Sequence, residues 1–234
     1  RTNLISGRVC ADGGDAVNYN ITAFNPAGTE ATLNRAPSSG CLNVGDEVLV
    51  INLQGTSTLY SNTGNYETLE ISNVNGATIT FKNPKVNYYG DGATNDNNLG
   101  TLSTNQKVML QRVPNYRNVV VNNSFNFYPD AWGSESAENA SYREGKGGVM
   151  FFRASGNVVV NGTIHANALG FRGGAGGPGG ANAVRDPGGY LGESYNGANL
   201  GVGGGSASTN ATNGGGKATR EAATSPNNGY ATGG

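Results

Sequence analysis

Two cysteines, Cys10 and Cys41, carry the most specific chemistry in this sequence. A lone cysteine pair in a chain with few charges and many asparagines favours a disulfide, and the alternative is two buried thiols. In the chain-entropy model, closing a loop of about 30 residues stabilises a fold by roughly 3–4 kcal/mol. We expect no zinc site, because two cysteines and one histidine do not supply four ligands without carboxylates.

Catalytic patterns are weak throughout the chain. His165 is the sole histidine, and no Gly-x-Ser-x-Gly elbow accompanies it, so we expect a strand histidine and no triad member. Gly214-Gly-Gly-Lys217 lacks the spacing and the Ser or Thr of a phosphate loop. Carboxylates such as Asp46 and Glu47 lie beside predicted strands without forming the close pair that a glycosidase needs. We therefore predict no catalytic residue.

One oxygen-rich run, residues 91–98, is a weak calcium candidate through Asp91, Asn95 and Asp96. Calcium takes six to eight oxygen ligands and tolerates irregular loops. No acidic residue closes this run at the distance that an EF-hand uses, so a polar hairpin loop is the main alternative. No other cofactor is expected.

Aromatic residues gather between positions 88 and 132. Tyr88, Tyr89, Tyr128 and Trp132 are candidates for a surface on which a sugar stacks. Aromatic residues with this spacing also commonly cap a β core, and that interpretation stays open.

Five Asn-x-Ser/Thr sequons are candidate glycosylation sites, although several would arise by chance in a chain rich in Asn, Ser and Thr. They begin at Asn20, Asn122, Asn139, Asn161 and Asn210.

The elements that would position these residues are predicted to be strands, because short β-branched runs alternate with Gly and Asn turns and a 3.6-residue period is hard to find. Tyr66 to Val74 and Ala77 to Phe81 flank Asn75-Gly76, a typical hairpin turn. Further runs are predicted to be strands, namely Val17 to Phe24, Glu47 to Leu53, Lys107 to Val113, Asn118 to Asn122, Val149 to Arg153 and Asn157 to Ala166.

An internal repeat connects two of these runs. The sequence Asn118-Val-Val-Val-Asn122 recurs at positions 157–161. Stacked coils of a β-solenoid use such asparagine-bounded valine strands, because each coil pairs its backbone with the next and their inward side chains stack.

Composition changes near residue 172. From 173 to 234 glycine dominates and aliphatic residues are scarce, so this segment buries too little apolar area to offset its ordering entropy by itself. We expect it to be extended and held by main-chain pairing with a neighbouring subunit. The alternative is that it folds back on its own solenoid. The predicted organisation is a disulfide-stapled β domain over 1–113, β-solenoid strands over 114–172 and a glycine-rich extended segment over 173–234.

Several segments between roughly residues 42 and 180 share a recognisable pattern, namely Val44–Gly55, Gly64–Thr68, Val113–Tyr116, Asn118–Asn122, Gly147–Gly156, Val158–Ala166 and Gly170–Gly174. Together they resemble the glycine-rich β-solenoid modules of large secreted or cell-surface proteins of filamentous and gliding bacteria. It implies an all-β protein with a small barrel-like or sandwich N-terminal unit that leads into a solenoid. These motifs are structural, so they imply architecture and location more than activity.

Composition excludes several classes of function. With 15 basic and 16 acidic residues the net charge is −1, which argues against general nucleic-acid binding. No run approaches 18 apolar residues, and no signal peptide is visible. We expect a secreted, non-catalytic structural subunit of a filament, sheath or matrix fibre that self-assembles through its glycine-rich segment. The alternatives are a monomeric adhesin that binds surface polysaccharide and a polysaccharide-degrading β-helix enzyme.

Overall fold

The protein is represented by a computed structural model, which describes residue 8 and residues 10–56, 58–102, 104–133, 145–167 and 169–171. Within these ranges the chain is all-β, with twelve strands and no helix. Accordingly, the described part contains no helix suited to crossing a membrane. The predicted glycine-rich segment 173–234 lies outside the described residues.

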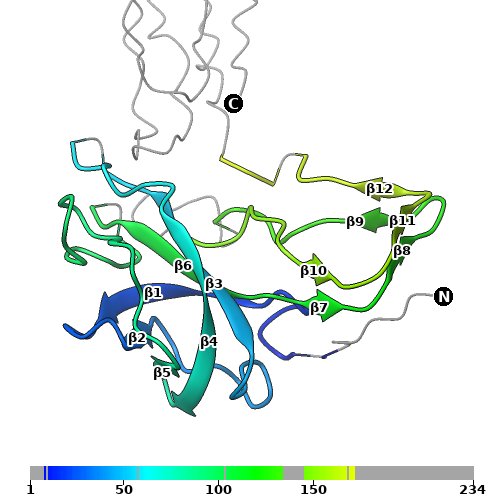
Figure 1. The fold of residues 1–234 in the computed structure, drawn as a ribbon. Helices are drawn as coiled ribbons and strands as arrows, with labels where there is room; N and C mark the ends of the chain where they lie inside the picture. The colour runs from blue at the N-terminus through cyan, green and yellow to red at the C-terminus, as the bar shows by residue number, and fades with distance from the viewer. Residues whose placement is uncertain are drawn as a thin grey trace, which may run out of the picture.

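Six strands form a closed antiparallel barrel in the order β1-β2-β5-β4-β3-β6 (Figure 1). The strands are β1 (Asn18–Phe24), β2 (Glu30–Leu33), β3 (Glu47–Gln54), β4 (Tyr66–Asn75), β5 (Thr78–Phe81) and β6 (Lys107–Arg112). β4 and β5 form the hairpin predicted at Asn75-Gly76, and Gly76 has the positive φ of 56° that this turn requires. Sequence patterns missed β2, which is only four residues long and mixes Glu and Thr with apolar residues.

Alternation along the strands builds the barrel core. On β1, Tyr19 and Ile21 are fully buried in the core cluster, and on β6 Val108 and Leu110 join them. Successive side chains of a strand point to opposite faces, so Met109 and Gln111 of β6 must lie outside the barrel. All six residues of β6 are nevertheless buried, so another part of the chain covers this outer face.

The cover comes from residues 128–133 and 145–152, which follow the barrel in sequence. The Gly147 N–H donates to Met109 Sδ at 3.1 Å, and Asn20 Nδ2 donates to the Gly145 carbonyl at 3.3 Å. A strand was predicted over Val149–Arg153, but the strand found there, β10 (Arg153–Ala154), begins only at Arg153. The residues before it belong to no ladder, although Phe152 packs against the stacked strands.

Three parallel two-stranded ladders follow the barrel and lie beside it in Figure 1. Their strands are β7 (Asn115–Tyr116), β8 (Val119–Val121), β9 (Asn126–Phe127), β10 (Arg153–Ala154), β11 (Val158–Val160) and β12 (Thr163–Ile164). β10 pairs with β7, β11 with β8 and β12 with β9. The repeated valine triplets stack residue for residue, because Val158, Val159 and Val160 pair with Val119, Val120 and Val121.

A small second core lies between the ladders. Tyr116, Val119 and Val121 are buried there, and Phe127, Phe152, Ala154 and Ile164 pack against them. The rings of Phe127 and Phe152 lie 5.2 Å apart. The stacked strands are thus held by side-chain packing as well as by their backbone pairing.

Candidate functional site

Cys10 and Cys41 form a disulfide across 31 residues, with their Cα atoms 5.0 Å apart. Asp12 lies close to both sulfur atoms, but the sulfurs are bonded to one another, so the trio presents no thiolate to a metal. The Asp12 carboxylate instead accepts hydrogen bonds from the Ser38 N–H at 2.7 Å, the Ser38 hydroxyl at 2.6 Å and the Tyr19 hydroxyl at 2.7 Å. The disulfide and the Asp12 carboxylate therefore both connect the segment around residues 10–12 to the segment around residues 38–41.

These contacts shift the pKa values of Asp12 and Tyr19. Burial alone would raise the pKa of Asp12, but the hydrogen bonds from Ser38 and Tyr19 and the charge of Arg35 lower it from 3.8 to about 2. Burial, together with the bond to Asp12, raises the pKa of the Tyr19 phenol.

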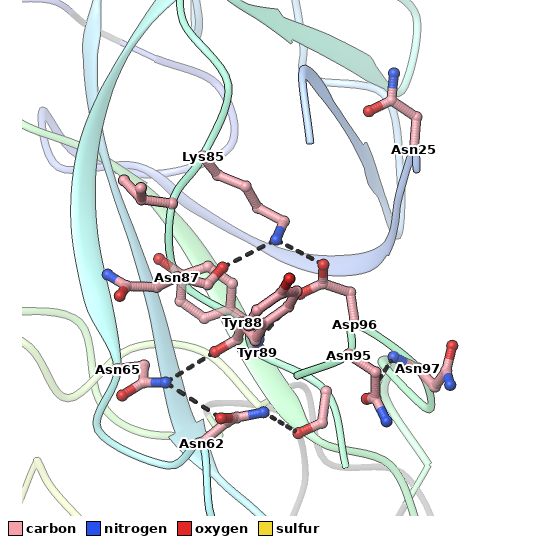
Figure 2. Close-up of polar contacts among 12 residues, drawn as sticks. Asn25, Asn62, Asn65, Lys85, Asn87, Tyr88, Tyr89, Asn95, Asp96 and Asn97 are labelled. Carbon is pink, nitrogen blue, oxygen red and sulfur yellow. Dashed lines mark hydrogen bonds and ion pairs between the residues drawn. The ribbon is translucent and has the colours of Figure 1, made fainter. Parts of the chain in front are cut away.

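The long connection between β5 and β6 is held around Lys85, shown in Figure 2. Lys85 Nζ lies 2.6 Å from Asp96 Oδ2 and 2.9 Å from the Asn87 carbonyl. The ammonium group also lies 5.0–5.6 Å from the ring centroids of Phe24, Tyr88 and Tyr89. A cation enclosed by three aromatic rings and a carboxylate is a structural anchor for this connection.

The calcium candidates lie within this connection. Asp96 pairs with Lys85, and its Oδ1 accepts a hydrogen bond from the Tyr89 N–H at 3.0 Å. Asn95 Oδ1 accepts hydrogen bonds from the N–H groups of Gly92 and Asn97, each at 3.1 Å. Oxygens of both residues are thus used inside the loop, while Asp91 is half-buried. Calcium binding here stays a prediction.

The sugar-stacking candidates are divided between two places. Tyr89 is fully buried and donates its hydroxyl to Glu67 Oε1 at 2.8 Å, and burial raises its pKa. Tyr88 is exposed on one side and faces Lys85 on the other. Trp132 is buried, with its ring 5.1 Å from that of Phe171, whereas Tyr128 is exposed and stacks on His165 at 5.7 Å. Of the four, Tyr128 presents the most accessible ring.

Tyr128 borders a cleft of about 110 Å³ between the barrel and the stacked strands, which we call the junction cleft. Other residues that line it are Asp15, Gln111, Asp130, Phe151 and Phe152. Gln111 is 1% exposed, and its Nε2 has no hydrogen-bond partner among the described residues. Sequence reasoning missed Gln111, since a single glutamine within a strand gives no signal for a site.

Ion pairs hold the two walls of the junction together. Arg153 at the start of β10 donates through Nε and Nη2 to the Glu47 carboxylate of β3, at 2.6–2.9 Å. The bonds from Arg153 lower the pKa of Glu47. Asp15, which precedes β1, accepts from Arg112 at 2.5 Å and from the Tyr116 hydroxyl at 3.0 Å. The Glu47–Arg153 ion pair and the Asp15–Tyr116 hydrogen bond therefore connect the barrel to the stacked strands.

The sequons within the described residues differ in accessibility. Asn20 is fully buried, and a glycan on it would require its side chain to leave the Gly145 carbonyl. Asn122 and Asn161 are exposed where β8 and β11 end. Asn139 and Asn210 lie outside the described residues.

The stacked strands end in an uncovered row. Val158 and Val160 of β11 are 46% and 47% exposed, although their partners Val119 and Val121 are buried. The Asn157 carbonyl and the Asn161 N–H face β8, so alternation turns the backbone groups of Val158 and Val160 away from it. Within the described residues no strand pairs with this side of β11. We call this side of β10, β11 and β12 the open edge.

The described residues thus define an all-β protein in which a closed antiparallel barrel leads into stacked parallel strands. No family model and no curated protein matches the sequence. The tailspike protein gp49 from Pseudomonas phage LKA1 is similar with a TM-score of 0.28 and 18% identity, over 47% of this chain and 16% of its own. The tailspike gp61 of Pseudomonas phage phi297 is similar with a TM-score of 0.27 and 19% identity, over 63% and 20%. The chain covers a fifth or less of each tailspike.

Proposed function

We propose that this chain is a secreted, non-catalytic structural protein that builds a filament, sheath or matrix fibre with an adhesive role. In this proposal the barrel covers one end of a β-solenoid, and the parallel strands are the first two coils of that solenoid. The open edge of the second coil then pairs with strands of a neighbouring copy. The disulfide supports a location outside the reducing cytoplasm.

The single observation that carries the proposal is the half-exposed valine row at the open edge. Val158 and Val160 continue the buried column that starts at Val119 and Val121, so their side chains belong to an interior that the described residues leave partly uncovered. An edge strand with outward N–H and C=O groups is a template for another strand. A further coil would satisfy the backbone and cover the valines at the same time.

Proline substitution at adjacent positions tests this pairing. Val160→Pro removes an N–H that points away from β8, so we expect the fold to persist and assembly to decrease about tenfold or more. Val159→Pro is the matched control, because its N–H faces β8 and its loss should lower the melting temperature. Size-exclusion chromatography with light scattering and negative-stain microscopy measure assembly. A chain that is monomeric at high concentration, or a Val160→Pro variant that assembles normally, would contradict the proposal.

The glycine-rich segment is tested separately. A chain that ends at Arg172 keeps every described residue and lacks 173–234. If this segment contributes to subunit contacts, the shortened chain assembles less well than the full chain under the same conditions. Equal assembly would assign the contact to the open edge alone.

A further inference from the structure

We infer that the junction cleft binds one pyranose ring of a polysaccharide, with Gln111 as a hydrogen-bond donor and Tyr128 as the stacking ring. This inference goes beyond the structural role proposed above and does not depend on pairing at the open edge. It starts from a buried polar atom that has no hydrogen-bond partner within the described part of the chain.

The atom is Nε2 of Gln111, a residue that lines the cleft from the outer face of β6, and no described residue accepts a hydrogen bond from it. Buried amide groups almost always have a hydrogen-bond partner, so this amide on a cleft-lining residue points to a ligand that accepts a hydrogen bond. Hydroxyl and ring oxygens of a sugar are such acceptors. The cleft is smaller than the roughly 300–1,000 Å³ of typical drug-sized sites, so it fits one ring while the rest of a chain lies outside.

Aromatic and acidic side chains at the same cleft complete the recognition. The Tyr128 ring is 59% exposed, and His165 stacks on it at an interplanar angle of 27°, which holds its orientation. An exposed, oriented ring offers a flat apolar surface to the C–H face of a pyranose. Asp130 is exposed at the cleft and accepts a hydrogen bond from Asn18 Nδ2 at 3.0 Å, and its carboxylate can also accept from sugar hydroxyls.

Saturation-transfer NMR with the full chain tests the inference. The probes are methyl glycosides of glucose, galactose, mannose and N-acetylglucosamine, each titrated into the millimolar range. We expect at least one to bind, with the strongest transfer to the C–H protons of one ring face. Failure of all four probes to bind would overturn the inference.

Variants then assign the contacts. Gln111→Leu should weaken binding about tenfold or more while the melting temperature stays equal or rises, because the change removes an unsatisfied buried donor. Tyr128→Ala should weaken binding to a similar extent. Tyr66→Ala is the matched control, since Tyr66 is 60% exposed on β4 and does not line the cleft. Binding that is unchanged in Gln111→Leu and Tyr128→Ala, or equally lowered in Tyr66→Ala, would overturn the assignment.

The two proposals fail in different ways. Val160→Pro leaves the residues of the cleft in place and should bind the glycosides as the unchanged chain does. Gln111→Leu should assemble normally. Loss of assembly with retained glycoside binding would therefore separate the open edge from the junction cleft.

Discussion

At the scale of single residues, Asp12 concentrates several stabilising contacts. Its carboxylate accepts three hydrogen bonds from Ser38 and Tyr19 next to the disulfide, and these lower its pKa to about 2. Because the pKa in the folded protein lies below the ordinary value of 3.8, the ionised carboxylate stabilises the fold above about pH 4. This contribution is lost as the pH falls from about 4 toward 2.

The first prediction concerns the variant Asp12→Asn. Its free energy of unfolding at pH 6 should be lower than that of the unchanged chain by about 1–2 kcal/mol, after allowing for solvent screening. The difference should shrink as the pH approaches 2. Urea unfolding followed by fluorescence at several pH values measures both effects. Glu70→Gln, which removes an exposed ion pair with Lys82, is the control and should change stability by less than about 1 kcal/mol. A difference for Asp12→Asn that is independent of pH would contradict this account.

At the scale of elements, the packing of segment 145–152 against residues 128–133 depends on close backbone approach. Gly147 has a φ of 85°, and a Cβ added there would lie 2.3 Å from the Ala131 carbonyl oxygen. Both the dihedral and the space therefore require glycine. The same segment contacts Met109 of β6 through the Gly147 N–H, and its residues 149–152 line the junction cleft.

A pair of glycine variants separates the two requirements. Gly64→Ala has a similar φ of 89° but open space around the added Cβ, so it should lose only about 1–2 kcal/mol of unfolding free energy. Gly147→Ala adds a clash with backbone atoms and should lose at least about 3 kcal/mol. Urea titrations measure the free energy of unfolding of both variants and of the chain without substitutions. Equal losses would mean that segment 145–152 moves aside at little cost.

At the scale of the whole molecule, a few long-range connections tie the N-terminal region to the barrel and the barrel to the stacked strands. The disulfide joins Cys10 to Cys41, and the bond of Arg153 to Glu47 joins β10 to β3. The barrel core and the second core are separate clusters, so these connections matter for how the two parts hold together.

Removing the disulfide should destabilise the molecule without changing its fold. The double variant Cys10→Ser/Cys41→Ser should lose roughly 3–4 kcal/mol of unfolding free energy, because the unfolded chain regains the freedom of a 31-residue loop. Its far-ultraviolet circular dichroism should stay that of a β protein. A reducing agent should lower the stability of the unchanged chain to the same level and leave the double variant unaffected. If a reducing agent does not change the free energy of unfolding of the chain with both cysteines, the disulfide does not stabilise the fold as proposed.

Local sequence patterns determined much of the strand arrangement. Asn75-Gly76 encodes its own turn, since both residues tolerate positive φ, and the flanking runs alternate with the period of a strand. The repeated valine triplets predicted stacked strands, and β8 and β11 pair in parallel through those residues. Such features rest on neighbouring residues alone, which is why they can be read without coordinates.

Tertiary structure alone decided which side chains are covered. Tyr89 and Trp132 are buried whereas Tyr128 is exposed, although all three are aromatic residues near strands. Gln111 became part of a cleft because a segment some forty residues later in the sequence packs on the outer face of β6. Burial depends on which distant segment reaches a given face, and that contact has no signature in the residues on either side of the position.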